Sequence, residues 1–132
     1  MTPVVQTIFA TGQPDSPIGN CLQAAIASLL DLPLDDVPHF VGDDVATDGE
    51  LHWWTQWRRW CADRGLVVRD GVDLEPGEYY LGGGPSPRDP EHRSHVAVYR
   101  NGELIHDPYP GGTGVVEVRT RWTIRPRVGE SL

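Results

Sequence analysis

Apolar residues recur at helical spacing in two stretches of the first half of the chain. These stretches cover Asn20–Leu30 and Glu50–Arg64. Their apolar stripes are Leu22, Ala25, Ile26, Leu29 and Leu30 in the first, and Trp53, Trp54, Trp57, Trp60 and Cys61 in the second. Because each stretch has one apolar face, we predict two helices packed against the rest of the protein, ended by Pro33 and Gly65.

Alternating and β-branched segments predict strands in most of the remaining chain. The expected strands are Pro3–Phe9 at a sheet edge, Leu66–Val68, Glu78–Leu81, Ser94–Tyr99, Glu103–Asp107 and Val115–Ile124. Between them, Gly82–Pro90 is rich in glycine and proline, which predicts a flexible, exposed loop. This order of elements predicts an α+β fold in a single domain, residues 1–132, with N-terminal helices packed on a mostly antiparallel β-sheet.

The hairpin around Asn101-Gly102 has two alternative registers. A three-residue turn pairs Tyr99 with Glu103 and places His95 directly opposite Asp107 on one face. A two-residue turn instead directs Asp107 to the opposite face. We expect the three-residue turn, because it also pairs apolar residues across the two strands.

Composition narrows the classes of function. The 132 residues suffice for one core, and a net charge of −8, with arginine as the sole basic residue besides histidine, argues against direct nucleic-acid binding. No segment resembles a signal peptide or the roughly 18 apolar residues of a membrane span, so we expect a cytoplasmic protein without a membrane partner. Both cysteines are expected to be reduced, with a Cys21–Cys61 disulfide as the alternative.

Cys21 opens the first predicted helix and is the candidate nucleophile. A helix N-terminus carries roughly half a positive charge, which favours the thiolate that attacks carbonyls. His95, at the start of a predicted strand, suits the role of general base, and Asp107 suits the role of the acid that orients it. The predicted loop before His95 is well placed to border the substrate.

Other residues are candidates for the same site. The backbone N–H of Cys21 and a side-chain amide, from Gln6 or from Gln13, would stabilise the oxyanion, and Gln6 is preferred because a strand would hold it. Asn20 either caps the helix or contacts substrate. Trp53 belongs either to the buried face of its helix or to an aromatic wall of the substrate groove.

Two alternatives concern the histidines. His106, adjacent to Asp107, is the main rival of His95 as the base, ahead of the other three histidines: His39, His52 and His92. Several of these residues, with Cys61, would also suit zinc, but no Cys-x-x-Cys or His-Glu-x-x-His spacing is present. We therefore expect neither a metal nor another cofactor.

Three motifs carry a resemblance to a known family. They are Gly19–Ala25, Ser94–Tyr99 and His106-Asp107-Pro108, and the stretches Leu32–Pro38 and Tyr80–Pro87 add to them. Together they resemble the papain-like cysteine peptidase superfamily, in particular its small bacterial branch with bacteriocin-leader-cleaving peptidases, and short papain-like proteins of phages and actinobacteria. The resemblance implies a papain-like fold, with Cys21, His95 and Asp107 as a triad and Gln6 or Gln13 as the oxyanion donor.

The function expected from these residues is a thiol hydrolase that cleaves an amide, peptide or isopeptide bond through an acyl-enzyme. Its partner would be a peptide or another amide-containing substrate. Two alternatives remain open: a catalytically idle papain-like module that binds a protein, such as a phage or host factor, and an acyltransferase using the same thioester. The tryptophan helix and the acidic segment Asp43–Glu50 would form the binding surface of the idle module.

Overall fold

Two helices cover one side of an antiparallel sheet in this protein. The computed structural model describes residues 1–10, 17–42 and 52–127. Its helical elements are α1 (Cys21–Leu30), the short 3-10 helix η1 (Leu34–Asp36) and α2 (His52–Asp63). Its strands are β1 (Leu66–Asp70), β2 (Tyr79–Pro85), β3 (Ser94–Arg100), β4 (Glu103–His106) and β5 (Thr120–Pro126). The predicted α+β class is confirmed, and both predicted helices are present: α1 begins one residue later than expected and α2 ends one residue earlier, while the expected start of the second helix lies outside the described residues.

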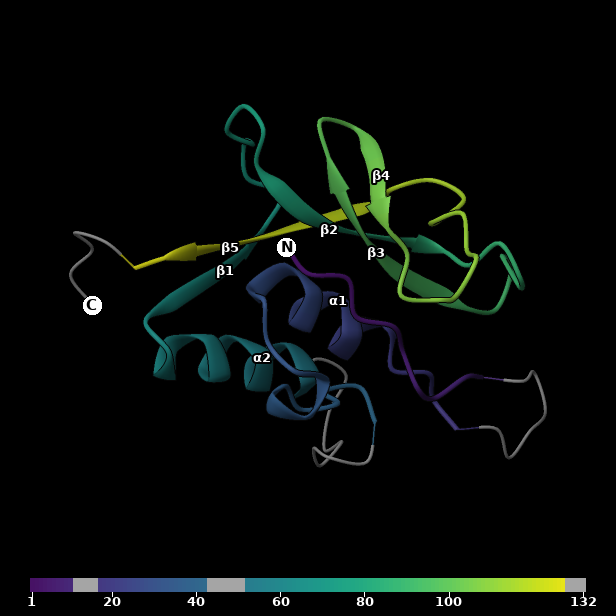
Figure 1. The fold of residues 1–132 in the computed structure, drawn as a ribbon, viewed down its shortest axis with the longest axis horizontal. Coiled ribbons are helices and arrows are strands. Elements are labelled where there is room, and N and C mark those ends of the chain that lie inside the picture. Colours follow the sequence, from purple (N-terminus) through teal and green to yellow (C-terminus); the bar gives the residue numbers. More distant parts are fainter. Residues whose placement is uncertain (11–16, 43–51, 128–132) are drawn as a thin grey trace.

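The sheet has the strand order β1-β5-β2-β3-β4, and each neighbouring pair is antiparallel. Helix α1 packs mainly on β3, and α2 packs on β1 (Figure 1). The largest side chains of the core come from both helices, the sheet and the segment after η1, and they include Trp57, Ile26, Phe40, Leu81 and Val98. This arrangement brings the start of α1 close to the start of β3.

Helix α1 is buried on nearly all sides. Ala24, Ala25 and Ala27 have no exposed surface, because small side chains let the helix approach its neighbours closely. The helix ends at Leu30, where Asp31 adopts a left-handed conformation and its N–H binds the carbonyls of the last turn. Pro33 lies beyond this end and prevents the helix from continuing.

The N-terminal segment is not a strand, contrary to the prediction for Pro3–Phe9. Its backbone donates to different partners, from Thr2 to the Ser28 carbonyl and from Gln6 to the Pro108 carbonyl. It therefore runs along α1 and reaches the segment after β4 without joining the sheet ladder (Figure 1). Period-two alternation cannot distinguish such an extended segment from a true edge strand.

Strand β2 continues through the glycines that were predicted to open a loop. Gly82, Gly83 and Gly84 pair with β3, and glycine is needed at each of them because a Cβ would collide with a neighbour. A Cβ on Gly83 would come within 2.7 Å of the Trp122 ring, and one on Gly84 would overlap the carbonyl oxygen of Glu117. These glycines allow close packing in the sheet, and the irregular chain begins only after Pro85.

The predicted hairpin register is wrong. Asn101 and Gly102 both have positive φ, at 52° and 78°, as a two-residue type I′ turn requires, and Arg100 pairs with Glu103. The ladder then shifts by one residue, because Tyr99 pairs with Leu104 but the next pair is Val98 with His106. Asp107 follows His106, and the bulge turns its side chain to the same face of the sheet as that of His95. The two side chains therefore meet, although the turn differs from the predicted one.

Candidate active site

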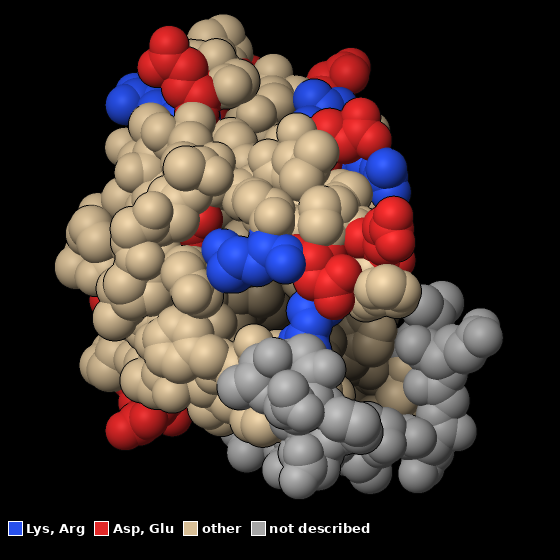
Figure 2. Space-filling view, turned by 90° about the vertical axis from the view of Figure 1, so that its right-hand side faces the viewer, with Lys and Arg blue, Asp and Glu red and all other residues tan. Residues whose placement is uncertain are grey.

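Cys21, His95 and Gln6 line one open pocket with a volume of about 1020 Å³. Cys21 lies at the first position of α1 and is half-buried. His95 lies near the start of β3, next to the valines that pack in the core, and it is 3% exposed. The pocket opens on the face shown in Figure 2, where a hollow is rimmed by arginine and acidic side chains. The α1 terminus and the β3 terminus thus present a thiol and an imidazole to the same space.

A short hydrogen bond joins His95 to Asp107. The His95 Nε2 lies 2.6 Å from Asp107 Oδ1, and the two side chains are 3% and 2% exposed. The carboxylate also accepts the backbone N–H of Tyr109 at Oδ1, at 2.8 Å, and that of Gly114 at Oδ2, at 2.7 Å. With Nε2 engaged by Asp107, Nδ1 is the imidazole nitrogen left to face the pocket.

The ionisation of this pair follows from these contacts. Burial opposes protonation of His95, but hydrogen bonds to Asp107 and Cys21, and the charges of the same two groups, raise its pKa from 6.5 to about 9. Burial also opposes ionisation of Asp107, yet the His95 hydrogen bond and the two backbone N–H groups hold its pKa below the usual value of 3.8. At neutral pH the pair is therefore an imidazolium facing a carboxylate.

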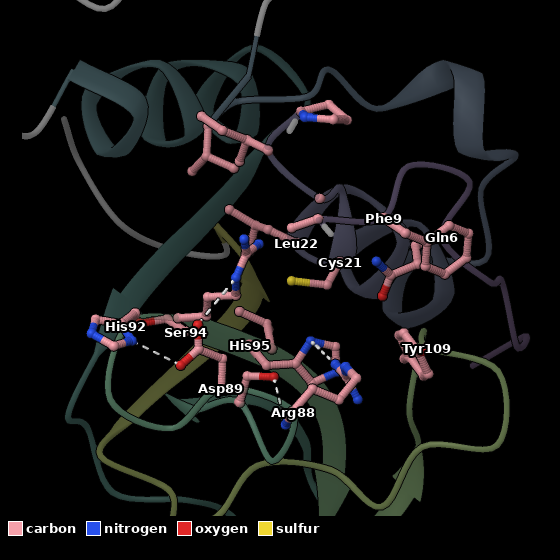
Figure 3. A pocket seen from close by; sticks show the side chains of 18 of the residues that line it. Gln6, Phe9, Cys21, Leu22, Arg88, Asp89, His92, Ser94, His95 and Tyr109 are labelled. Carbon is pink, nitrogen blue, oxygen red and sulfur yellow. Dashed lines mark hydrogen bonds and ion pairs between the residues drawn. The ribbon is translucent and has the colours of Figure 1, made fainter. Parts of the chain in front are cut away.

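Gln6 is held beside the start of α1. Its side chain is buried, and its Nε2 donates to the carbonyl of Ile8 at 2.9 Å. The same nitrogen packs against Gly19, where an added Cβ would lie 3.4 Å away, and the Gln6 backbone N–H binds the carbonyl of Pro108. Figure 3 shows the Gln6 amide and the Cys21 sulfur in the same pocket. The other candidate donor, Gln13, lies outside the described residues.

Asn20 does not cap α1 through its side chain. Its Oδ1 accepts the backbone N–H groups of Thr7 and Ile8, at 3.0 and 2.8 Å, and its Nδ2 donates to Thr7 Oγ1 and to Gln23 Oε1. The side chain is 1% exposed and is not among the residues that line the pocket. It therefore joins the N-terminal segment to the helix, and so fixes the position from which Gln6 reaches the site.

The tryptophans of α2 contribute both to the core and to the pocket wall. Trp57 is fully buried, whereas Trp53 lines the pocket and packs against Trp57 with ring centres 6.4 Å apart. Trp53 thus packs on the buried face of its helix and also forms part of the pocket wall. Cys61 has the predicted core position, and burial raises the pKa of its thiol to about 12. Both cysteines are free, so the alternative disulfide is absent.

The remaining histidines do not replace His95. The Nε2 of His106 is 2.7 Å from the carbonyl oxygen of Val4, so it anchors the N-terminal segment. His92 lines the pocket but is exposed and pairs with Asp89 at 3.0 Å. Within the described ranges, no group of three histidine, cysteine or acidic residues is placed to hold a metal ion.

Several residues that line the pocket were not predicted from the sequence. Arg88 contacts His95 and stacks on Tyr109, and the Phe9 ring packs against that of Tyr109 (Figure 3). For Arg88 a signal was present, because it belongs to the loop that was predicted to border the substrate. For Phe9 and Tyr109 no local signal existed, since their proximity depends on how the N-terminal segment and the chain after β4 meet.

Comparisons with protein-family models, with curated proteins and with solved structures found no match for this chain. The class that the structure itself defines is an α+β protein with two α-helices and a five-stranded antiparallel sheet in its described part. None of the helices described here is both long and apolar enough to cross a membrane. The papain-like resemblance therefore rests on the sequence motifs alone and stays a prediction.

Proposed function

We propose that the protein is a papain-like thiol hydrolase that cleaves an amide bond with Cys21 as nucleophile, His95 as general acid and base, and Asp107 as the group that orients His95. The observation that carries the proposal is the buried 2.6 Å hydrogen bond between His95 and Asp107, formed beside an accessible thiol at a helix N-terminus. A structural His–Asp pair would not need a cysteine and an open pocket next to it.

The contacts support a two-step reaction. In the first step, the Cys21 thiolate attacks the carbonyl carbon, the carbonyl electrons move to oxygen, and a C–S bond forms. His95, protonated at Nδ1, then gives its proton to the amide nitrogen as the C–N bond breaks. In the second step, His95 takes a proton from water, which attacks the thioester and releases the Cys21 sulfur as the acid product leaves.

Two groups suit the stabilisation of the oxyanion. The backbone N–H of Cys21 is one of the helix N-terminal donors that have no acceptor inside the helix. The second is the Gln6 Nε2, which packs against Gly19 and has one of its two hydrogens engaged by Ile8. Donors fixed before the substrate arrives stabilise the developing charge without further rearrangement.

The idle-module alternative receives less support. Trp57, at the centre of its tryptophan stripe, is fully buried and unable to contact a partner, whereas its acidic segment, Asp43–Glu50, lies outside the described residues and adds no argument. The acyltransferase alternative shares the acyl-enzyme with the hydrolase, and only product analysis with and without an added amine separates the two.

Alkylation kinetics of the full-length protein test the proposal. Iodoacetamide at pH 6.5 should modify Cys21 at least about tenfold faster than free cysteine, because an imidazolium favours the thiolate. The His95→Ala variant should lose this excess. Cys61 provides an internal control, since it is fully buried and should stay unmodified until the protein unfolds. Mass spectrometry locates each adduct, and a Cys21 that reacts no faster than free cysteine would refute the proposal.

A further inference from the structure

Some of the charged residues that line the pocket form ion pairs with one another, and one does not. Asp89 is engaged by two of them, by His92 Nδ1 at 3.0 Å and by Arg93 Nε at 3.5 Å. Arg88 lines the same pocket, yet it has no carboxylate partner in the part of the chain that the structure describes. Among the described residues, no carboxylate therefore balances the charge of the Arg88 guanidinium in this pocket.

This guanidinium is held in place by an aromatic ring. The Cζ of Arg88 lies 3.6 Å from the centre of the Tyr109 ring. Tyr109 is itself fixed on two sides, since its N–H donates to Asp107 and the Phe9 ring meets it edge to face, with centres 5.5 Å apart. A guanidinium stacked by its face keeps its N–H edges free, and those edges match a carboxylate in a bidentate manner.

One N–H edge of Arg88 is directed at His95. The Arg88 Nη2 lies 3.5 Å from His95 Nδ1, the nitrogen that faces the pocket. When His95 is protonated, both groups are cationic donors and neither can accept a hydrogen bond from the other. Both groups line the pocket that Cys21 also lines, so an anion bound there could accept an N–H group from either cation (Figure 3).

We propose that Arg88 is a specificity-determining residue that binds a carboxylate of the substrate close to the scissile bond. The inference rests on the proposed function of Cys21 and names its substrate class: an amide that carries a carboxylate within reach of Arg88. The carboxylate belongs either to an acidic side chain or to a free C-terminus. The protein's net charge of −8 opposes such a substrate at a distance, but salt screens this repulsion beyond about 8 Å, and the local charge of Arg88 then decides.

The first test uses a matched pair of small alkylating agents on the full-length protein. Iodoacetate carries a carboxylate and iodoacetamide carries an amide, while both react with the same thiolate. The ratio of their rates at Cys21 therefore reports attraction of the carboxylate, independently of how much thiolate is present. Arg88→Ala should lower this ratio about tenfold, as expected for the loss of a charge-assisted contact, and Arg88→Lys should retain part of it.

Arg64→Ala is the control for this experiment. Arg64 is also exposed and stacked on an aromatic ring, with its Cζ 4.2 Å from the centre of the Trp60 ring, but it does not line the pocket. Its removal changes the net charge equally and should leave the ratio unchanged. An unchanged ratio in Arg88→Ala, with Cys21 still reactive, would overturn the inference while leaving the hydrolase proposal intact. Slow alkylation of Cys21 by both reagents in the wild type would instead overturn the hydrolase proposal, and this inference with it.

The second test separates the two sources of the carboxylate. Peptidyl acyloxymethyl ketone probes with Asp or Asn beside the electrophile examine a side-chain carboxylate. Peptide substrates ending in a free carboxylate or a carboxamide, one residue beyond the scissile bond, examine a C-terminal one. The preferred acidic member of one pair should lose its advantage in Arg88→Ala, mainly through KM, whereas no acidic preference in either pair would contradict the inference.

Discussion

Replacing Asp107 by asparagine should make the stability of the protein depend differently on pH. The substitution preserves size but removes the charge that faces His95, whose pKa is raised from 6.5 to about 9. A group with a raised folded-state pKa stabilises the protein fully below its unfolded pKa, and this contribution is lost as the pH rises through the folded value. The benefit of the His95 proton should therefore be complete below pH 6.5 and absent well above pH 9.

The magnitude follows from the size of the shift. One pKa unit corresponds to about 1.36 kcal/mol, so the shift of His95 represents about 3 kcal/mol, of which Cys21 supplies a part. The lowered pKa of Asp107 adds stability that is present above pH 3.8 and is lost as the pH falls through the folded value. The difference between wild type and Asp107→Asn should thus be largest between about pH 4 and pH 6.5.

Urea denaturation at pH 5.5, 7, 8 and 9.5 would measure this difference. We expect the wild type to exceed Asp107→Asn by about 3 kcal/mol at pH 5.5, and by about 1 kcal/mol at pH 9.5, where only the altered backbone hydrogen bonds remain. Asp89→Asn is the matched control, because Asp89 also pairs with a histidine, but His92 is 76% exposed and such pairs contribute less than about 1 kcal/mol. A difference that stays constant over this pH range would refute the assignment of the His95 proton.

Two further substitutions test how the fold supports the site. Gly84→Ala should lower the free energy of unfolding by about 2 to 3 kcal/mol, measured by urea denaturation, because its Cβ would overlap the backbone carbonyl of Glu117. A neutral result would mean that the segment before β5 does not pack this closely on β2. Asn20→Ala should lower the free energy of unfolding by about 2 to 4 kcal/mol, because it leaves the N–H groups of Thr7 and Ile8 without their acceptor. Hydrogen exchange at those two amides should rise, and unchanged exchange there would contradict the role of Asn20.

The sequence predicted the helices well because helical periodicity is a local property. Each stripe of apolar residues defines a face that must be buried, and α1 and the described part of α2 agree with the expected ranges to within one residue. The position of Cys21 at a helix start could be read in the same way. The pattern was less informative for the N-terminal segment, since an extended chain held by single hydrogen bonds has the same alternation as a strand.

The hairpin illustrates what local reasoning omits. Both registers considered from the sequence were uniform along the two strands. The strands instead use the two-residue turn, and the register then shifts by one residue at a bulge after Leu104. Two contacts hold the residues that follow the bulge: His106 bonds Val4, outside the hairpin, and Asp107 bonds His95 on the facing strand. His95 and Asp107 were therefore correctly predicted to meet, but the predicted register between β3 and β4 was wrong.

The sequence by itself determined the α+β class, the thiol at the head of α1, and the order in which cysteine, histidine and aspartate follow one another. Only the tertiary structure decided that Gln6 lines the same pocket as that thiol, that Arg88 stacks on Tyr109, and that a bulge lets Asp107 bond His95. The reason is physical: periodicity records which face of an element is buried, whereas contacts between distant segments depend on one-residue shifts and close approaches that involve the whole packed molecule.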